Sequence, residues 1–194
     1  MSESSTSRLG GACAALLGVS YLLVAVTFFA DFLRGDVLFV LGAVCAFGAV
    51  PAISKAAGSG ASEWVGWAAR LAYVGFATVA VRNASTLTLE PNSPAYENPG
   101  IDDLGWLTYG AVGAWLLIVN VVALRHRTWP RALSYAGLGA SIAYFAAPLL
   151  DTIELFAGAS PASAAVENGI AVVGGLVLGP LWYIWHGIRL WRRD

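Results

Sequence analysis

The sequence has few charged side chains, and this scarcity sets the class of protein. Of its 194 residues, 12% are Asp, Glu, Lys or Arg, whereas a soluble domain carries about 25%. The chain is 58% hydrophobic and its mean hydropathy is +0.68, as is typical of membrane proteins. The net charge of −1 provides no basic excess for nucleic acid. We therefore expect an integral membrane protein without a nucleic-acid partner.

Cysteine and histidine are also scarce, with two of each. The chain has no CxxC, HExxH or P-loop motif, and Cys13 and Cys45 lie in apolar runs as small buried residues. A haem held by two histidines needs both at one depth, but we expect His126 in a loop and His186 in a span. A Ser141–His186 catalytic pair is mismatched in the same way. The sequence therefore indicates a non-catalytic protein and leaves any cofactor unknown.

Six apolar runs are long enough to cross a bilayer. They predict an all-α fold, a single six-helix transmembrane domain over residues 1–194 with spans at about 9–32, 37–57, 64–89, 104–124, 132–156 and 169–190. The longest connection, residues 83–103, holds three prolines, which do not continue a helix. We expect this extracytoplasmic loop to lie as a cap over one face of the bundle.

Basic residues are divided unevenly between the two ends of these spans. The side that holds the tails and the loops after the second and fourth spans, together with the span ends next to them, carries nine of the 11 basic residues, leaving only Arg34 and Arg82 for the other side. The positive-inside rule then places both termini in the cytoplasm. Tryptophans near the span ends, Trp129 and Trp182 among them, are expected in an interfacial aromatic belt.

The span at residues 64–89 is unusual because it carries two arginines. Arg70 lies about two turns from Trp64, so its side chain can extend to the cytoplasmic interface. Arg82 lies about 18 Å further along the helix, on a side of the protein rich in acids. An arginine buried in a membrane is stabilised by carboxylates and often marks a ligand or ion pathway.

Polar groups on neighbouring spans are candidate partners for Arg82. Asp151 and Glu154 share a helix face at positions i and i+3, and other spans end in acids at similar depth. The predicted pocket comprises Arg82, Asn83, Asp151, Glu154, Glu167, Tyr144 and Asp31. The alternative is that these groups stand in water, because Asp151 lies about 30 Å along its helix from Arg131, a full bilayer core.

Two segments carry a family resemblance. The tail at residues 179–190, Gly-Pro-Leu-Trp-Tyr-Ile-Trp-His-Gly-Ile-Arg-Leu, resembles the ending of a family of small bacterial and archaeal membrane proteins of unknown function. The basic turn from Arg125 to Pro130, with its Trp-Pro pair, resembles the same family. The resemblance implies about 200 residues, six spans and a prokaryotic cytoplasmic membrane, and it brings no activity or site residues with it.

Two functions stay open. Small residues spaced i, i+4 permit close helix packing, either within the chain or against a partner: Ala14 with Gly18, Gly110 with Ala114, and Gly175 with Gly179. With short loops and no catalytic constellation, they favour an accessory or structural subunit of a membrane complex. Its partners would be the lipid bilayer, other membrane subunits or a second copy. The alternative is a small transporter or ligand-binding membrane protein that uses the pocket around Arg82.

Overall fold

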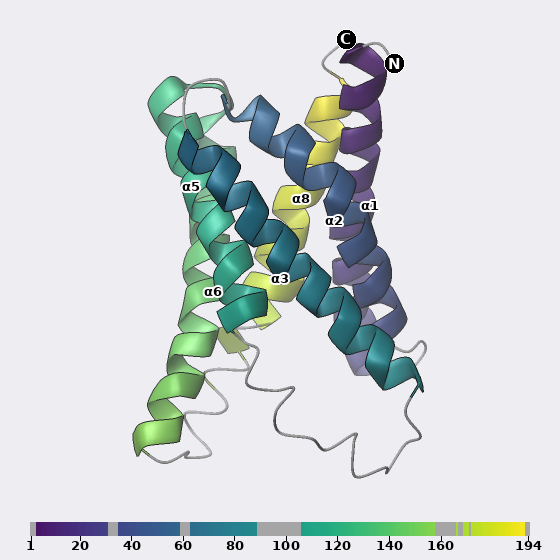
Figure 1. Cartoon of the computed structure of the whole chain (residues 1–194), viewed down its shortest axis with the longest axis vertical. Coiled ribbons are helices and arrows are strands. Elements are labelled where there is room, and N and C mark those ends of the chain that lie inside the picture. Colours follow the sequence, from purple (N-terminus) through teal and green to yellow (C-terminus); the bar gives the residue numbers. More distant parts are fainter. Residues whose placement is uncertain are drawn as a thin grey trace.

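Long helices run between two ends of the molecule, as the computed structural model shows (Figure 1). The structure describes residues 3–30, 35–58, 63–88, 106–157, 166, 169–170 and 172–192, without the side chains of residues 3–4, 28–30, 88, 151, 154–155 and 157. Every regular element in these ranges is helical: α1 (Glu3–Ala30), α2 (Gly35–Ala56), α3 (Glu63–Thr88), η2 (Trp106–Gly110), α5 (Ala111–His126), α6 (Arg131–Ala157), η3 (Val172–Leu178) and α8 (Gly179–Trp191). The η segments are π-helical.

Within the described residues, five stretches are long and apolar enough to cross a membrane: Ser5–Thr27, Gly35–Ala56, Glu63–Leu87, Trp106–His126 and Arg131–Leu150. Large apolar side chains such as Leu16, Val44 and Ile142 are exposed on their surfaces, as expected of helices that face lipid. The chain therefore forms an all-α membrane bundle. The region predicted as the span at residues 169–190 holds two adjoining elements, η3 of 7 residues and α8 of 13.

The helices alternate in direction, and the N- and C-termini lie at the same end of the bundle (Figure 1). Helix α1 packs between α2 and α8, while α5 packs against α6 on the other side. Helix α3 crosses the face of the bundle diagonally and contacts both α2 and α5. We call the end opposite the termini the far end; α1, α3 and α6 finish there, and α2 and η2 begin there.

The small-residue pairs are used inside the chain. Ala14 is buried, and a Cβ added at Gly18 would stand 2.7 Å from Ile184 Cγ1 on α8. A Cβ at Gly179 would stand 3.2 Å from the Tyr144 ring on α6. These residues let α1 and α6 approach the η3–α8 segment closely, as small residues do between membrane helices.

The basic turn between α5 and α6 is fixed by hydrogen bonds. Helix α5 ends at His126, so this histidine belongs to the helix and the prediction that it lies in a loop is wrong. The next residue, Arg127, adopts a left-handed conformation (φ 52°) and its N–H donates to Ala123 O, the usual way of closing a helix C-terminus. Arg189 Nη2 of α8 then donates to Thr128 O at 2.8 Å.

Two tryptophans predicted for the interfacial belt are core residues instead. Trp129 and Trp182 are 5% and 1% exposed. Trp182 Nε1 donates to Asn120 Oδ1 at 3.2 Å and to Leu133 O at 3.0 Å. Because the polar edge of this indole is satisfied inside the protein, it does not need the headgroup region.

Helix α3 is longer than the predicted loop boundary at residue 83 allows. It continues to Thr88, and the polar residues of its last turns bond back to their own helix. Asn83 Nδ2 donates to Val79 O at 2.8 Å, and Thr86 Oγ1 donates to Asn83 O at 2.8 Å. These bonds satisfy polar side chains within the helix. Residues 83–88, which the predicted span at 64–89 and the predicted connection at 83–103 shared, therefore belong to the helix.

Candidate functional site

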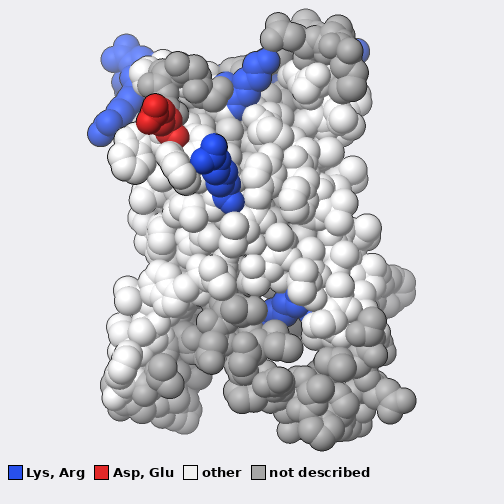
Figure 2. Space-filling model, in the orientation of Figure 1, with Lys and Arg blue, Asp and Glu red and all other residues white. Residues whose placement is uncertain are grey.

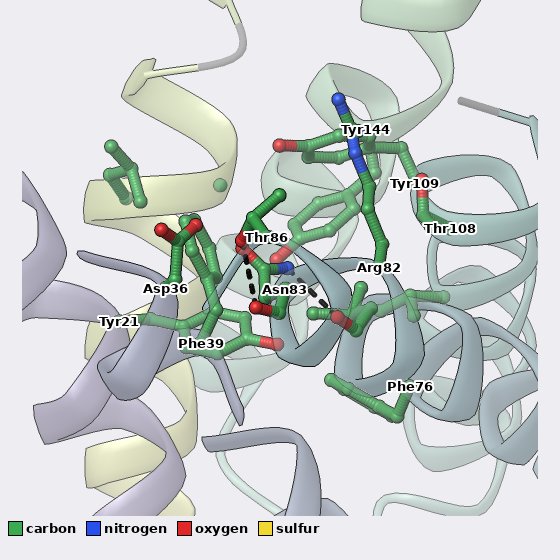
Figure 3. A pocket seen from close by; sticks show the side chains of 14 residues that line it. Tyr21, Asp36, Phe39, Phe76, Arg82, Asn83, Thr86, Thr108, Tyr109 and Tyr144 are labelled. Carbon is green, nitrogen blue, oxygen red and sulfur yellow. Dashed lines mark hydrogen bonds between the residues drawn. The ribbon is translucent and has the colours of Figure 1, made fainter. Parts of the chain in front are cut away.

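A cavity of about 440 Å³ lies inside the bundle near the far end (Figure 3). We call it the tyrosine cavity. Helices α1, α2, α3, α5 and α6 and both π-helical segments contribute to its wall. Its polar lining is Tyr21, Asp36, Arg82, Asn83, Thr86, Thr108, Tyr109 and Tyr144, and its apolar lining is Phe39, Phe76, Val79, Val112, Gly175 and Leu176.

The structure brings three of the predicted site residues to this one cavity. Arg82 and Asn83 reach it from α3 and Tyr144 reaches it from α6. The remaining predicted residues lie outside what the structure describes, namely Asp31, Glu167 and the side chains of Asp151 and Glu154. Arg82 therefore shares a cavity with tyrosines and an amide.

Asp36 is the acid that sequence reasoning missed. It lies in the first turn of α2 and lines the cavity, whereas the prediction chose Asp31 at the end of the preceding span. The sequence could have identified Asp36, because an acid in the first turn of one span lies at the same depth as the end of the preceding span. Asp36 and Arg82 lie on opposite sides of the cavity (Figure 3).

Tyrosines supply most of the remaining polar lining. Tyr109 and Tyr144 lie with ring centroids 5.6 Å apart. Tyr21 is 5% exposed, packs edge-on against Phe39 at 5.2 Å, and its hydroxyl has no hydrogen-bond partner in the part of the chain that the structure describes. Leaving such a buried group unsatisfied costs about 1–3 kcal/mol. Tyr21 therefore lines the cavity with its ring, while its hydroxyl oxygen is enclosed by protein atoms.

Both π-helical segments line the tyrosine cavity. Thr108 and Tyr109 belong to η2, and Gly175 and Leu176 belong to η3. A π-helical stretch is rare and occurs often at functional sites, where its wider turn redirects side chains. The sequence offered no signal for either segment, since both follow an ordinary apolar pattern.

Packing fixes the position of η2 on the cavity wall. Trp106 Nε1 donates to Thr152 Oγ1 at 2.9 Å, and that hydroxyl donates to Pro148 O at 2.7 Å. On the other side, a Cβ added at Gly75 of α3 would stand 3.0 Å from Thr108 O. The glycine thus allows α3 and η2 to approach closely, and α6 holds η2 through a side-chain hydrogen bond.

An aromatic column fills the bundle between the cavity and the end that carries the termini. Ring contacts run from the cavity wall inward, with centroids 4.3 to 6.4 Å apart, through Phe76, Tyr183, Trp182, His186 and Trp129. Trp115 joins this column by stacking on Tyr183 and donates through Nε1 to Ser54 Oγ at 3.0 Å. The cavity is therefore closed on its inner side by packed rings.

Basic side chains gather at the end with the termini, and one basic patch stands apart in the lower half of the molecule (Figure 2). Of the basic residues that the structure describes, Arg82 is the one that lies toward the far end of the bundle, where α3 finishes. No group of three or more His, Cys, Asp or Glu that could hold a metal occurs among the described residues. Among the lining residues that the structure describes, the charged groups are one cation, Arg82, and one anion, Asp36, beside several hydroxyls.

The resemblance of the tail at residues 179–190 to small six-span membrane proteins stays a prediction. No protein-family model, no curated protein and no solved structure matches the chain.

Proposed function

We propose that this is a six-span protein of a prokaryotic cytoplasmic membrane, with both termini in the cytoplasm, that binds a small molecule in the tyrosine cavity. The orientation is supported by the basic residues, which gather at the end with the termini. The sixth span is η3 followed by α8, which returns the chain to the end where it began (Figure 1).

The observation that carries the proposal is the charged lining of a cavity of about 440 Å³. Ligand pockets commonly measure about 300–1,000 Å³ and combine apolar walls with a few convergent polar groups. An arginine within a membrane span is costly, and such residues mark substrate or ion sites. Arg82 and Asp36, in one cavity with apolar and aromatic side chains, fit this description.

The proposed ligand reaches the cavity from the outer side. In the proposed orientation the far end faces away from the cytoplasm, and the aromatic column closes the cavity inward. This arrangement supports a binding site loaded from outside rather than an open channel.

The accessory-subunit function predicted from the sequence has less support from the geometry. Two of the three small-residue pairs that suggested a partner surface, Ala14 with Gly18 and Gly175 with Gly179, pack against the chain's own helices. A partner chain that copurifies at fixed stoichiometry would nevertheless favour that function over ligand binding.

Thermal unfolding of the full-length protein in lipid nanodiscs tests the proposal. The panel consists of small amines, carboxylates, phosphates and zwitterions. A ligand at 100 times its Kd stabilises the folded state by about 2.7 kcal/mol, so we expect at least one class to raise the Tm by several degrees.

A cavity-filling variant makes this test specific. Gly175 lines the cavity, and a Cβ added there stands 3.5 Å from Tyr109 Cε1, an ordinary contact. The longer side chain of Gly175→Leu should therefore extend into the cavity. Gly66→Leu is the matched control, because an added Cβ there has no neighbour within 4 Å. The ligand-induced shift should vanish in Gly175→Leu and persist in Gly66→Leu. No shift with any compound, or an equal shift in both variants, would contradict the proposal.

A further inference from the structure

We propose that the ligand is a small zwitterion, with its anionic group at Arg82 and its ammonium group at Asp36. This inference rests on the proposed function and names the ligand class of the same cavity. The two charged residues that line the described wall have opposite signs and stand on opposite sides (Figure 3). A ligand with a single charge would use only one of them, whereas a zwitterion uses both.

The wall around Arg82 suits an anion such as a carboxylate. A guanidinium presents several N–H donors in a planar fork that matches the two oxygens of a carboxylate. Tyr109 and Tyr144 lie on the same side of the cavity as Arg82 (Figure 3), and each carries a hydroxyl that can donate to an anionic oxygen. Hydrogen bonds to a charged acceptor are among the stronger ones in proteins.

The opposite wall suits an ammonium group. Asp36 provides the carboxylate, and Tyr21 and Phe39 provide an edge-on aromatic pair beside it (Figure 3). Aromatic faces attract cations within about 6 Å of the ring centroid.

The residues between the two walls can also bind the ammonium group. Asn83 Nδ2 and the Thr86 hydroxyl donate to carbonyl groups of α3. Each side chain therefore keeps an acceptor oxygen, Asn83 Oδ1 or Thr86 Oγ1, that an ammonium group can use. The apolar side chains of Phe76, Val79 and Leu176 leave room for a hydrocarbon body.

Binding to chemically blocked ligands tests this assignment. Titration calorimetry of the full-length protein in nanodiscs would use L-amino acids from alanine to tryptophan, each with its N-acetyl derivative and its methyl ester. Each block removes one charge and preserves the other. We expect either block to weaken binding of the best amino acid by tenfold or more, since hydrogen bonds to charged groups are worth about that much.

Substitutions assign each charge to its residue. Asp36→Asn keeps the shape of the side chain and should weaken binding of the free amino acid at least tenfold. The N-acetyl derivative should bind to this variant as tightly as it binds to the wild type. Arg82→Gln should weaken binding of the free and N-acetyl acids and leave the affinity for the methyl ester unchanged. Arg82→Lys provides a second variant if the first fails to fold. Arg70→Gln is the matched control on α3, because Arg70 stacks on Trp67 (4.5 Å) away from the cavity.

The outcomes separate this inference from the proposed function. If the N-acetyl acids bind as tightly as the free acids and Asp36→Asn has no effect, the site is an anion site and the zwitterion is ruled out. If a compound of another class binds and Gly175→Leu abolishes it while no amino acid binds, the zwitterion fails and the binding function stands. Asp36 also lies at the N-terminal end of α2, where an acid stabilises the helix. Affinity, and not stability, is therefore the deciding measurement.

Discussion

Single residues in this bundle set how closely the helices approach, and Asn120 shows this best. It is fully buried, its Nδ2 donates to Leu116 O at 2.7 Å, and its Oδ1 accepts from Trp182 Nε1. Facing it on α6 is Gly137, where an added Cβ would collide with the Asn120 side chain. The glycine is required because the asparagine is there.

A double-mutant cycle measures this dependence. Gly137→Ala alone should destabilise the protein by about 1–3 kcal/mol through overpacking. Asn120→Ala alone should cost about 0.5–1.5 kcal/mol, because Trp182 Nε1 loses one of its two acceptors and keeps Leu133 O. In the Asn120→Ala background, Gly137→Ala should cost much less, because the space is then free. Unfolding free energies that simply add would contradict this account of the α5–α6 contact.

Residue chemistry explains which part of the site could be predicted. Arg82 is identifiable from sequence because a basic residue deep in a span is rare. Tyr144 and Asn83 followed from their spacing to charged neighbours. Tyr21 and Asp36 did not, because their orientation toward the cavity depends on how α1 and α2 are rotated about their axes. Tyr21, for example, lies where Gly42 of α2 leaves space for its ring.

At the scale of elements, the two π-helical segments define the cavity wall. Their position depends on contacts with neighbouring helices, such as the close approach of Gly174 in η3 to Ala143 in α6. Hydrophobic periodicity predicts helices at these places and does not separate a π turn from an α turn. The described helices lie over the apolar runs that the sequence shows, whereas the shape of the cavity could not be predicted.

The hydrogen bond that holds η2 to α6 provides a test at this scale. Thr152→Val removes the acceptor of Trp106 Nε1 and should destabilise the protein by about 1 kcal/mol. It should also weaken ligand binding, because Thr108 and Tyr109 are no longer held in place. Thr78→Val is the matched control, since the Thr78 hydroxyl bonds only within its own helix, to Val74 O at 2.9 Å. Equal effects of the two variants on ligand affinity would show that η2 is positioned by other contacts.

For the whole molecule, the distribution of charge predicts the orientation in the membrane. The described basic residues lie at the end with the termini, except for Arg82. This orientation stays a prediction, and it can be made from sequence because the positive-inside rule depends on counts of basic residues in short loops and not on tertiary packing.

Cysteine labelling in intact cells tests this orientation. In a chain with Cys13 and Cys45 replaced by alanine, a cysteine at Ser93 should react with a membrane-impermeant maleimide from outside. A cysteine at Ser59, in the link after the second span, should react only after the cells are lysed. Labelling of both positions from outside, or the reverse pattern, would overturn the proposed topology.

The central claim is that the tyrosine cavity binds one small molecule. The most direct measurement is the binding stoichiometry of the most stabilising compound, determined by equilibrium dialysis on the wild type, Gly175→Leu and Gly66→Leu in nanodiscs. We expect one molecule per chain for the wild type and Gly66→Leu, and none for Gly175→Leu, whose side chain takes up the cavity. Equal stoichiometry for all three proteins would place the compound elsewhere and contradict the account.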